Sequence, residues 1–320
     1  MLFQSRSPDL AGSSPNPGPN LFVRDLTRQR TTLISVDAST GKALGQEAAN
    51  AWILGDGREV IQDLQISYTY QDDHWEGRPA KLLHWDEATG VTEDWTQRLT
   101  ALAGGARYHL PGTVHISRNA EILAFSFSDG LGVSSEVWDR SAGTLTPLPI
   151  RVDSRVTDVS PNGRWVLTLH GPAETYDPIG GTWIPEPRSY TIYDRVRGLA
   201  APVTFPNSLS PSDPRFTGDS EHLMFFSPIA QDGGRPSRRQ PLLYSLRDGT
   251  VSPILNREFG DLDLAKARCS PDLRWMIFTS FRPGFVEEDR NEASDVFLYD
   301  RYSGSLRTLS TRPRSMCRPC

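Results

Sequence analysis

The sequence predicts an all-β protein, a six-bladed β-propeller of four-stranded antiparallel blades whose first blade is incomplete at the N-terminus. Two turns that recur along the chain predict this fold. One follows a strand that ends in Asp, and the other opens with Ser-Pro-Asp or Ser-Pro-Asn before an apolar strand. No stretch shows helical periodicity of useful length. Because a four-stranded sheet cannot bury both of its faces alone, neighbouring sheets must stack, as they do in a propeller.

The first recurring turn follows the clearest strand of each unit. The six copies of that strand are residues 21–25, 82–86, 135–139, 190–194, 242–245 and 296–300, and five of them end in Asp. Four residues after the terminal position stands a glycine, at Gly90, Gly143, Gly198, Gly249 and Gly304, whereas the first copy has Gln29. An Asp that caps the turn and a glycine that accepts a positive φ are typical of a hairpin.

The second recurring turn comes earlier in each unit. The segment that starts at Ser160 matches the one that starts at Ser270 nearly residue for residue, and weaker copies start at Gly55, Ser117 and Gly218. The units run to about 50 to 60 residues, longer than common propeller repeats. The excess falls between the second and third strands, in residues 72–79, 171–187 and 231–241.

The first unit begins at its second strand, residues 1–5, so its innermost strand is missing. The last ten residues, 311–320, are rich in Arg and Pro and make a poor strand. We therefore predict one propeller domain over residues 1–310, an irregular tail over residues 311–320, and imperfect closure or a missing partner strand. A chain that starts within a strand is expected to be a fragment or to have an internal start, and residues 1–7 are not expected to be a signal peptide.

Composition and charge exclude several classes of protein. Hydrophobic residues make up 37% of the chain, enough for a packed core. The net charge is −5 with well-mixed signs, so the basic stripe of a nucleic-acid binder is missing. No apolar run of about 18 residues predicts a membrane span.

Metal and redox motifs are weak. Cys317 and Cys320 have redox-motif spacing but stand at the very end of the chain, so an incidental tail is favoured. The six histidines show no metal-binding spacing, and His84 and His222 are expected to be packing or rim residues. The acidic loop 287–295 has alternating oxygen-bearing side chains suited to calcium, but a solvated loop is favoured. We therefore expect no cofactor, with calcium as the open alternative.

The segment Ser-Pro-Asp/Asn-x-Arg-Trp at Ser160 and Ser270, followed by the strand Asp-Val-Phe-Leu-Tyr-Asp-Arg at 295–301, resembles the TolB-type β-propeller repeat of bacterial proteins. The resemblance covers nearly the whole chain and is most specific in these two copies. It implies six blades, a binding role and a periplasmic or extracellular setting. The chain departs from the pattern in its third unit, which lacks Pro-Asp-Gly, and at Ser245, which replaces the terminal Asp.

Candidate ligand-binding residues follow from register. The residues two or three positions before the start of each second turn fall on the innermost strands, which border the central channel of a propeller, where ligands bind. They are Trp52, His115, Asp158, Arg215 and Arg268. The alternative is a buried polar network, or side chains that point between the blades.

Two functions of different classes remain. The first, which we favour, is a monomeric, non-catalytic scaffold that binds a protein, a glycan or another cell-envelope ligand. The second is an enzyme such as a polysaccharide lyase or glycoside hydrolase with a polar site at the channel mouth, for which Asp158 and His115 are the only candidates. No Gly-x-Ser-x-Gly elbow supports a serine hydrolase.

Overall fold

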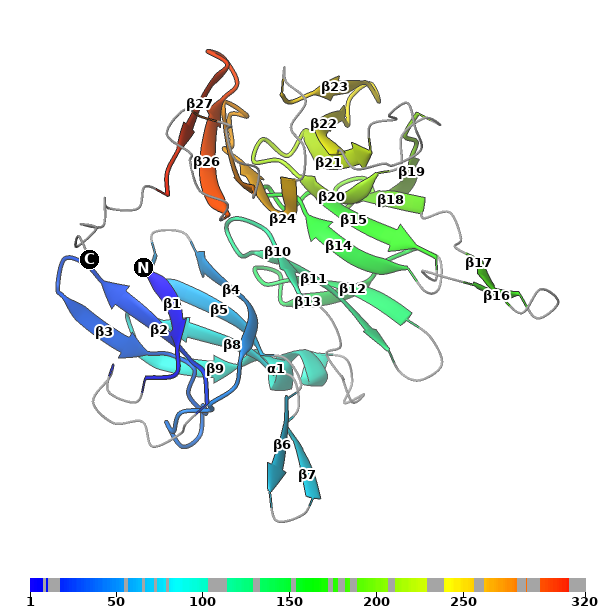
Figure 1. Ribbon diagram of the computed structural model, residues 1–320. Helices are drawn as coiled ribbons and strands as arrows, with labels where there is room; N and C mark the ends of the chain where they lie inside the picture. Colours follow the sequence, from blue (N-terminus) through cyan, green and yellow to red (C-terminus); the bar gives the residue numbers. More distant parts are fainter. Residues whose placement is uncertain are drawn as a thin grey trace, which may run out of the picture. The chain divides into compact units, whose positions relative to one another are not determined.

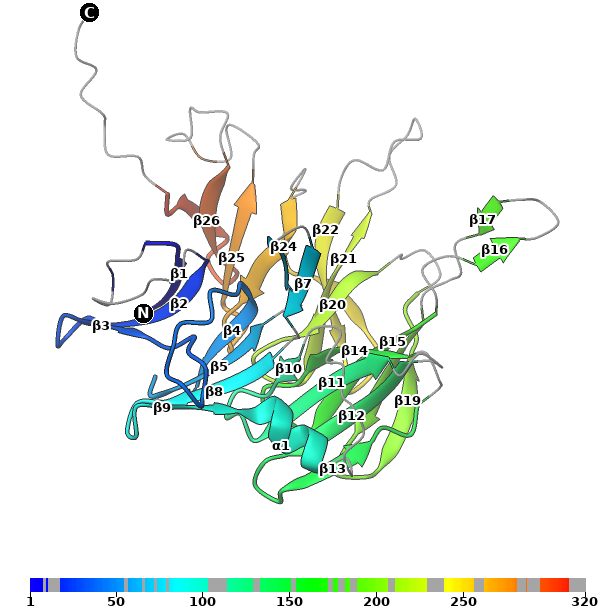
Figure 2. The ribbon, with the colours of Figure 1, turned by 90° about the horizontal axis from the view of Figure 1, so that it is seen from below.

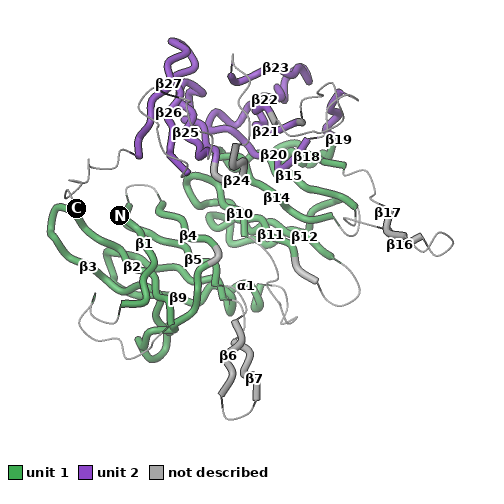
Figure 3. The backbone as a smooth tube through the Cα atoms, in the orientation of Figure 1, with its two compact units in different colours: residues 1–201 green, residues 202–320 purple. Residues whose placement is uncertain are grey.

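The structure, a computed structural model, describes residues 1–7, 10, 18–54, 57–64, 67–71, 74–78, 81–102, 114–128, 133–150, 154–171, 175–177, 182–184, 189–206, 211–228, 239–255, 262–280, 286 and 294–310. The chain divides into two compact units, residues 1–201 and residues 202–320 (Figure 3). Each repeat predicted from the sequence forms one antiparallel sheet. The predicted fold class, a six-bladed β-propeller with an incomplete first blade, is confirmed.

The first unit contains blades one to four (Figure 1). Blade one has three strands, β1 (Leu2–Ser5), β2 (Asn20–Asp25) and β3 (Arg30–Leu33). Blade two consists of β4 (Ala48–Leu54), β5 (Glu59–Leu64), β8 (Lys81–Asp86) and β9 (Val91–Asp94). Blade three consists of β10 (His115–Ile116), β11 (Ile122–Ser128), β12 (Val133–Asp139) and β13 (Thr144–Pro147). Blade four consists of β14 (Arg155–Val159), β15 (Trp165–His170), β18 (Ser189–Asp194) and β19 (Leu199–Val203).

The second unit contains blades five and six. Blade five consists of β20 (Ser212–Phe216), β21 (His222–Pro228), β22 (Arg239–Ser245) and β23 (Val251–Pro253). Blade six consists of β24 (Leu262–Cys269), β25 (Trp275–Ser280), β26 (Asp295–Asp300) and β27 (Ser305–Thr308). In every complete blade, the strand order in space follows the order in the chain.

Three elements were not foreseen from the sequence. Two additional hairpins, β6 (Ser67–Gln71) with β7 (His74–Arg78) and β16 (Thr175–Asp177) with β17 (Thr182–Ile184), account for part of the excess length. A helix, α1 (Trp95–Leu102), follows blade two and lies against β8 and β13 (Figures 1 and 2). This helix left no helical periodicity in the sequence, because only Trp95 and Leu99 are buried in it, and two positions are too few to show a period.

The hairpin turns form as the repeat predicts. Gly90, Gly143, Gly198, Gly249 and Gly304 all have φ between 65° and 70°, and Gln29 takes the same conformation at 56°. The Asp194 carboxylate accepts hydrogen bonds from two turn amides, and in blade five the hydroxyl of Ser245 accepts one from the amide of Arg247. The side-chain hydroxyl of Ser245 therefore caps this turn in place of the missing Asp carboxylate.

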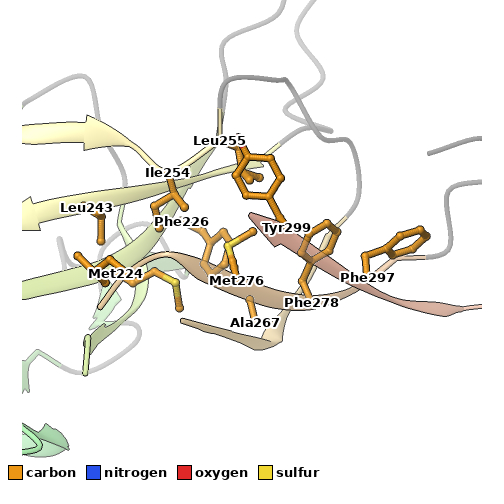
Figure 4. Packing of buried hydrophobic residues seen from close by; sticks show 11 residues of the cluster. Met224, Phe226, Leu243, Ile254, Leu255, Ala267, Met276, Phe278, Phe297 and Tyr299 are labelled. Carbon is orange, nitrogen blue, oxygen red and sulfur yellow. The ribbon is translucent and has the colours of Figure 1, made fainter. Parts of the chain in front are cut away.

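Apolar side chains from neighbouring blades form the core. In the first unit, Leu54, Ile61 and Leu82 of blade two pack with residues of blade three, among them the fully buried Trp138. In the second unit, Met224, Phe226 and Leu243 of blade five meet Met276, Phe278 and Phe297 of blade six (Figure 4). These clusters bury the sheet faces that a single blade would leave exposed.

Candidate functional site

Four innermost strands, β4, β14, β20 and β24, have an irregularity close to the candidate positions. The antiparallel register shifts between residues 48 and 50 in β4, 156 and 158 in β14, 212 and 215 in β20, and 263 and 268 in β24. Bulges of this kind re-aim the side chains that follow them and are frequent near binding sites. The shift stands directly before Asp158, Arg215 and Arg268.

His115 and Asp158 meet across two neighbouring innermost strands. The Nδ1 atom of His115 on β10 lies 3.9 Å from the Oδ1 atom of Asp158 on β14, and the two side chains are 11% and 19% exposed. The separation is longer than a direct hydrogen bond, so the pair is an electrostatic contact at a partly open surface. An imidazole and a carboxylate at this spacing can orient a polar ligand or exchange a proton with it.

Trp52 occupies the corresponding position in blade two but has a different environment. Its partly buried ring packs against the apolar cluster shared by blades two and three, beside Leu54 and Ile61. In this blade the side chain contributes to the contact between blades.

Arg215 and Arg268 belong to the second unit. The guanidinium of Arg215 lies 3.3 Å from Asp213 Oδ2, and its side chain is 34% exposed. Asp213 has a φ of 50°, a left-handed conformation that Asp adopts more readily than most residues. Arg268 donates a hydrogen bond from Nη1 to the carbonyl oxygen of Ala267 at 2.8 Å.

A second polar cluster, between blades two and three, was missed by the sequence analysis. Glu59 Oε2 lies 2.7 Å from His84 Nε2 and accepts a hydrogen bond from Arg140 Nη1 at 2.9 Å. The His84 ring stacks on Trp95 with centroids 4.3 Å apart, and the Arg140 guanidinium lies 5.0 Å from the Trp95 centroid. Glu59, His84 and Trp95 lie on β5, β8 and α1, and Arg140 lies in the turn after β12, so no spacing in the sequence brings the four residues together.

Burial in this cluster favours the neutral form of His84. Burial lowers the pKa of His84, although the hydrogen bond with Glu59 opposes that change. Burial raises the pKa of Glu59, but hydrogen bonds from His84 and Arg140 outweigh it, and the net pKa is below the usual value. His84 is therefore a buried packing residue, as its position on a strand suggested.

Asp63 has a buried carboxyl group, which also lies at the contact between blades two and three. Its side chain on β5 is 2% exposed, and Oδ2 accepts a hydrogen bond from the amide of Val114 at 3.5 Å. Burial raises the pKa of Asp63 to about 6, while the hydrogen bonds from Val114 and Asn50 oppose the rise. A carboxyl of this kind changes charge near neutral pH.

A surface cavity of about 480 Å³ lies between the hairpin turns of blades one and two, lined by Asp25, Thr27, Arg28, Arg58, Glu87 and Ala88. Arg28 Nη1 lies 2.9 Å from Glu87 Oε1 across this cavity, and the Arg28 side chain is 71% exposed. An exposed ion pair of this type contributes little to binding or stability. The cavity is therefore a shallow space between two hairpin turns that is lined mostly by polar side chains.

Several sequence predictions fall on residues that the structure does not describe. Cys317, Cys320 and most of the proposed calcium loop, residues 287–293, lie outside the described ranges. Within the described residues no cluster of three or more His, Cys, Asp or Glu side chains is arranged to hold a metal ion. In the same part of the chain, no helix has the length and apolar character needed to cross a membrane.

Comparisons with known proteins found similarity only among solved structures. Neither the family models nor the curated proteins gave a match. Oligogalacturonate lyase from Vibrio parahaemolyticus is 11% identical, with a TM-score of 0.58 over 91% of this chain and 71% of that chain. A putative TolB from Agrobacterium tumefaciens is 14% identical, with a TM-score of 0.52 over 89% of this chain and 86% of that chain. The propeller domain of the Trilobed protease from Pyrococcus furiosus is 10% identical, with a TM-score of 0.52 over 92% and 75%.

The lengths of these proteins differ widely from that of the chain. The chain spans 59% of TolB from Acinetobacter baumannii and 28% of the tricorn protease. At identities of this order the similarity establishes the fold alone. The predicted resemblance to TolB-type propellers is confirmed at that level.

Proposed function

We propose that this chain is a binding scaffold that presents the inner-strand positions and blade loops of a propeller to a protein or cell-envelope ligand. The observation that carries the proposal is the contact between His115 and Asp158. It places two polar, partly exposed side chains on the innermost strands of adjacent blades. Innermost strands border the channel of a propeller, where ligands bind.

Side-chain hydrogen bonds close the turns next to these positions. In the turn before β15, Ser160 Oγ accepts a hydrogen bond from the Trp165 amide and donates one to Asn162 Oδ1, both at 2.8 Å. Ser270 makes the same pair of contacts with Trp275 and Asp272 in blade six. Fixed turns next to the innermost strands reduce the ordering that a ligand must impose when it binds. The TolB-like neighbours are consistent with a scaffold role and with the periplasmic or extracellular setting that the resemblance implies.

Thermal unfolding of the full chain tests this proposal. The chain is heated alone and with a panel of glycans, cell-envelope fragments and divalent metals. We expect one cooperative transition whose midpoint rises with ligand concentration for one class of the panel. The rise should be lost in the double variant Asp158→Asn with His115→Gln and kept in Arg197→Gln, a change of an exposed arginine in the blade-four hairpin turn. A midpoint unchanged by every member of the panel would contradict the proposal.

A lyase activity is the second candidate, and the same His115–Asp158 pair favours it. β-Elimination from a uronate needs a base that removes a proton and an acid for the leaving oxygen, and an imidazole near a carboxylate can serve in these roles. The fold neighbours include oligogalacturonate lyases, one of them described in complex with manganese. The test is absorbance of the unsaturated product during incubation with oligogalacturonate, with and without manganese. Turnover that disappears in His115→Ala would favour the enzyme over the scaffold.

A further inference from the structure

Strand β1 of blade one has an open edge. It corresponds to the second strand of a complete blade, but it pairs with β2 alone, whereas each of the other five second strands also pairs with an innermost strand (Figure 1). Met1 and Arg24 exchange two backbone hydrogen bonds of 2.7 and 2.8 Å. Because such bonds alternate in direction along an antiparallel ladder, Phe3 also bonds to β2, and the backbone groups of Leu2 and Gln4 point to the open edge.

Contacts within the first unit hold β1 in its extended conformation. The Phe3 ring stacks on Phe22 of β2 with centroids 5.6 Å apart. Successive side chains of a strand point to opposite faces, and on the other face Leu2 packs against the apolar cluster that contains Val60 and Trp85 of blade two. A strand that is added at this edge therefore meets a partner that is already ordered, which lowers the entropic cost of binding.

The edge of β1 lacks the features that prevent strand addition elsewhere in the molecule. Each outer edge strand of the six blades carries a proline or a charged residue, namely Arg30 in β3, Glu93 and Asp94 in β9, Pro147 in β13, Pro202 in β19, Pro253 in β23 and Arg307 in β27. The sequence of β1, Leu-Phe-Gln-Ser, contains neither. Because prolines and charges on an edge block further pairing, the outer edges are protected and β1 is free to accept a strand.

The position opposite Leu2 belongs to the set of candidate ligand-binding positions. Leu2 pairs with Val23, two residues before the terminal Asp of β2. The residues at the same position of the other five second strands each pair with one candidate, Ile61 with Trp52, Ala124 with His115, Leu167 with Asp158, Met224 with Arg215 and Ile277 with Arg268. Among the described residues, Leu2 has no such partner on its open edge. A strand that pairs here brings its own side chain to the sixth equivalent position.

We propose that β1 is a docking site for an extended segment of a partner protein, which pairs antiparallel with β1 as the innermost strand of blade one. Main-chain hydrogen bonds supply the affinity in this mode of binding, so the segment must carry free amides where it faces β1. Residues 311–320 of this chain, rich in Arg and Pro, fit that requirement poorly, and we therefore assign the segment to a partner. The inference rests on the proposed scaffold function and deepens it, because the partner contributes a residue to the candidate positions.

The test titrates the full chain with a capped peptide that has the sequence of residues 50–54, Asn-Ala-Trp-Ile-Leu, flanked by lysines for solubility. In blade two these residues pair with β5 without interruption. The variant Gln4→Pro removes an amide from the open edge but no bond to β2, and the control Gln4→Thr keeps that amide. By calorimetry, we expect wild type and the control to bind the peptide alike and Gln4→Pro to bind it about tenfold more weakly or worse.

A second arm changes the peptide and leaves the protein intact, so it holds even where Gln4→Pro fails to fold. In blade two Trp52 pairs with Ile61, the counterpart of Leu2, so the tryptophan amide of the peptide is expected to donate to the carbonyl oxygen of Leu2. Methylation of that nitrogen should weaken binding about tenfold. Equal binding of the two peptides, or binding of neither, would overturn the docking site.

Hydrogen exchange tests whether the chain itself fills the edge. In the full chain alone, the amides of Leu2 and Gln4 should exchange rapidly and that of Phe3 slowly, and the peptide should slow the exchange of the first two. Slow exchange of Leu2 and Gln4 without peptide would assign the edge to another segment of this chain and overturn the partner. Rapid exchange that the peptide leaves unchanged would overturn the docking site.

The outcome is separable from that of the scaffold proposal. If a panel ligand raises the unfolding midpoint through His115 and Asp158 while the peptide does not bind at β1, the scaffold stands and the docking site falls. If the peptide binds and protects Leu2 and Gln4 while no panel ligand has any effect, the docking site stands and the scaffold proposal falls.

Discussion

Arg195 in the hairpin turn of blade four donates a hydrogen bond from Nη2 to Asp139 Oδ2 in the hairpin turn of blade three, at 2.8 Å. Its Nη1 atom donates to the carbonyl oxygen of Gly163 at the same distance. Asp139 also caps its own turn through the amide of Ala142. Burial raises the pKa of Asp139, yet these hydrogen bonds and the charge of Arg195 hold it below the usual value. One carboxylate thus closes a hairpin and joins two blades.

Removal of Arg195 should weaken the link between blades three and four. Because the two side chains are 22% and 25% exposed, we expect Arg195→Ala to lower the free energy of unfolding by about 1 kcal/mol. The control Arg197→Ala, whose side chain is 70% exposed and 3.8 Å from Asp194, should change it by less than about 0.5 kcal/mol. A denaturant cycle that includes Asp139→Ala measures the coupling. Fully additive effects would show that the pair is not coupled.

Gly163 is required by both its backbone and its surroundings. Its φ is 71°, and an added Cβ atom would lie 2.6 Å from Cγ1 of Ile122 on the neighbouring blade. We expect Gly163→Ala to destabilise the protein by about 2 to 4 kcal/mol, from backbone strain and crowding together. Gly198, with a φ of 68° and open space around it, separates the two effects, because Gly198→Ala should lose only about 1 kcal/mol. Equal losses in the two variants, measured by urea unfolding, would exclude the crowding.

The turns were predictable because their chemistry is local. A terminal Asp and a glycine four residues later determine the hairpin, and the structure adds that Gln29 and Ser245 fill the same roles where the pattern fails. The five candidate residues lie on the first strands of blades two to six, and their role in ligand binding stays a prediction. The register argument did not foresee the bulges, which depend on pairing with the next strand.

The cluster around Glu59 was not predictable, since its contacts join residues far apart in sequence. Arg140 stands 81 positions from Glu59, and Trp95 reaches the site on a helix too short to leave a periodic signal. The two additional hairpins, β6 with β7 and β16 with β17, could not be predicted from the sequence either, because their strands are short. Strands of three to five residues carry too little alternation to be recognised.

Glu59 should contribute more to the free energy of unfolding than Glu93, which also lies close to His84. Glu59 accepts hydrogen bonds from both His84 and Arg140, so Glu59→Gln should lower the free energy of unfolding by about 1 kcal/mol, a value reduced by its partial exposure. Glu93 is 59% exposed and 3.9 Å from His84, and Glu93→Gln retains an acceptor for the Trp95 indole. We expect that change to stay within about 0.5 kcal/mol in chemical denaturation. A larger loss of unfolding free energy in Glu93→Gln than in Glu59→Gln would contradict this assignment of contacts.

His84 should make the protein sensitive to acid. Burial lowers its pKa in the folded chain below the unfolded value of 6.5, so its contribution is present above that pH and is lost as the pH falls through the folded pKa. The stability of wild type relative to His84→Gln should therefore decrease between pH 7 and pH 5. Denaturant curves at each pH measure this difference. A difference that stays constant over the range would show that His84 does not titrate there.

Asp63 should give the unfolding free energy the opposite pH dependence to that of His84. Burial raises its folded pKa to about 6 from an unfolded value of 3.8, so stability is lost as the pH rises through this window and the charged form destabilises the fold at neutral pH. A shift of two units corresponds to about 3 kcal/mol, so Asp63→Asn should be more stable than wild type by up to about 3 kcal/mol above pH 7. Its advantage should shrink as the pH falls from 6 toward 4, where wild-type Asp63 becomes neutral. Because His84 is intact in both proteins, the difference between their unfolding free energies isolates Asp63. An advantage independent of pH would mean that the carboxyl is already neutral, or solvated, across the range.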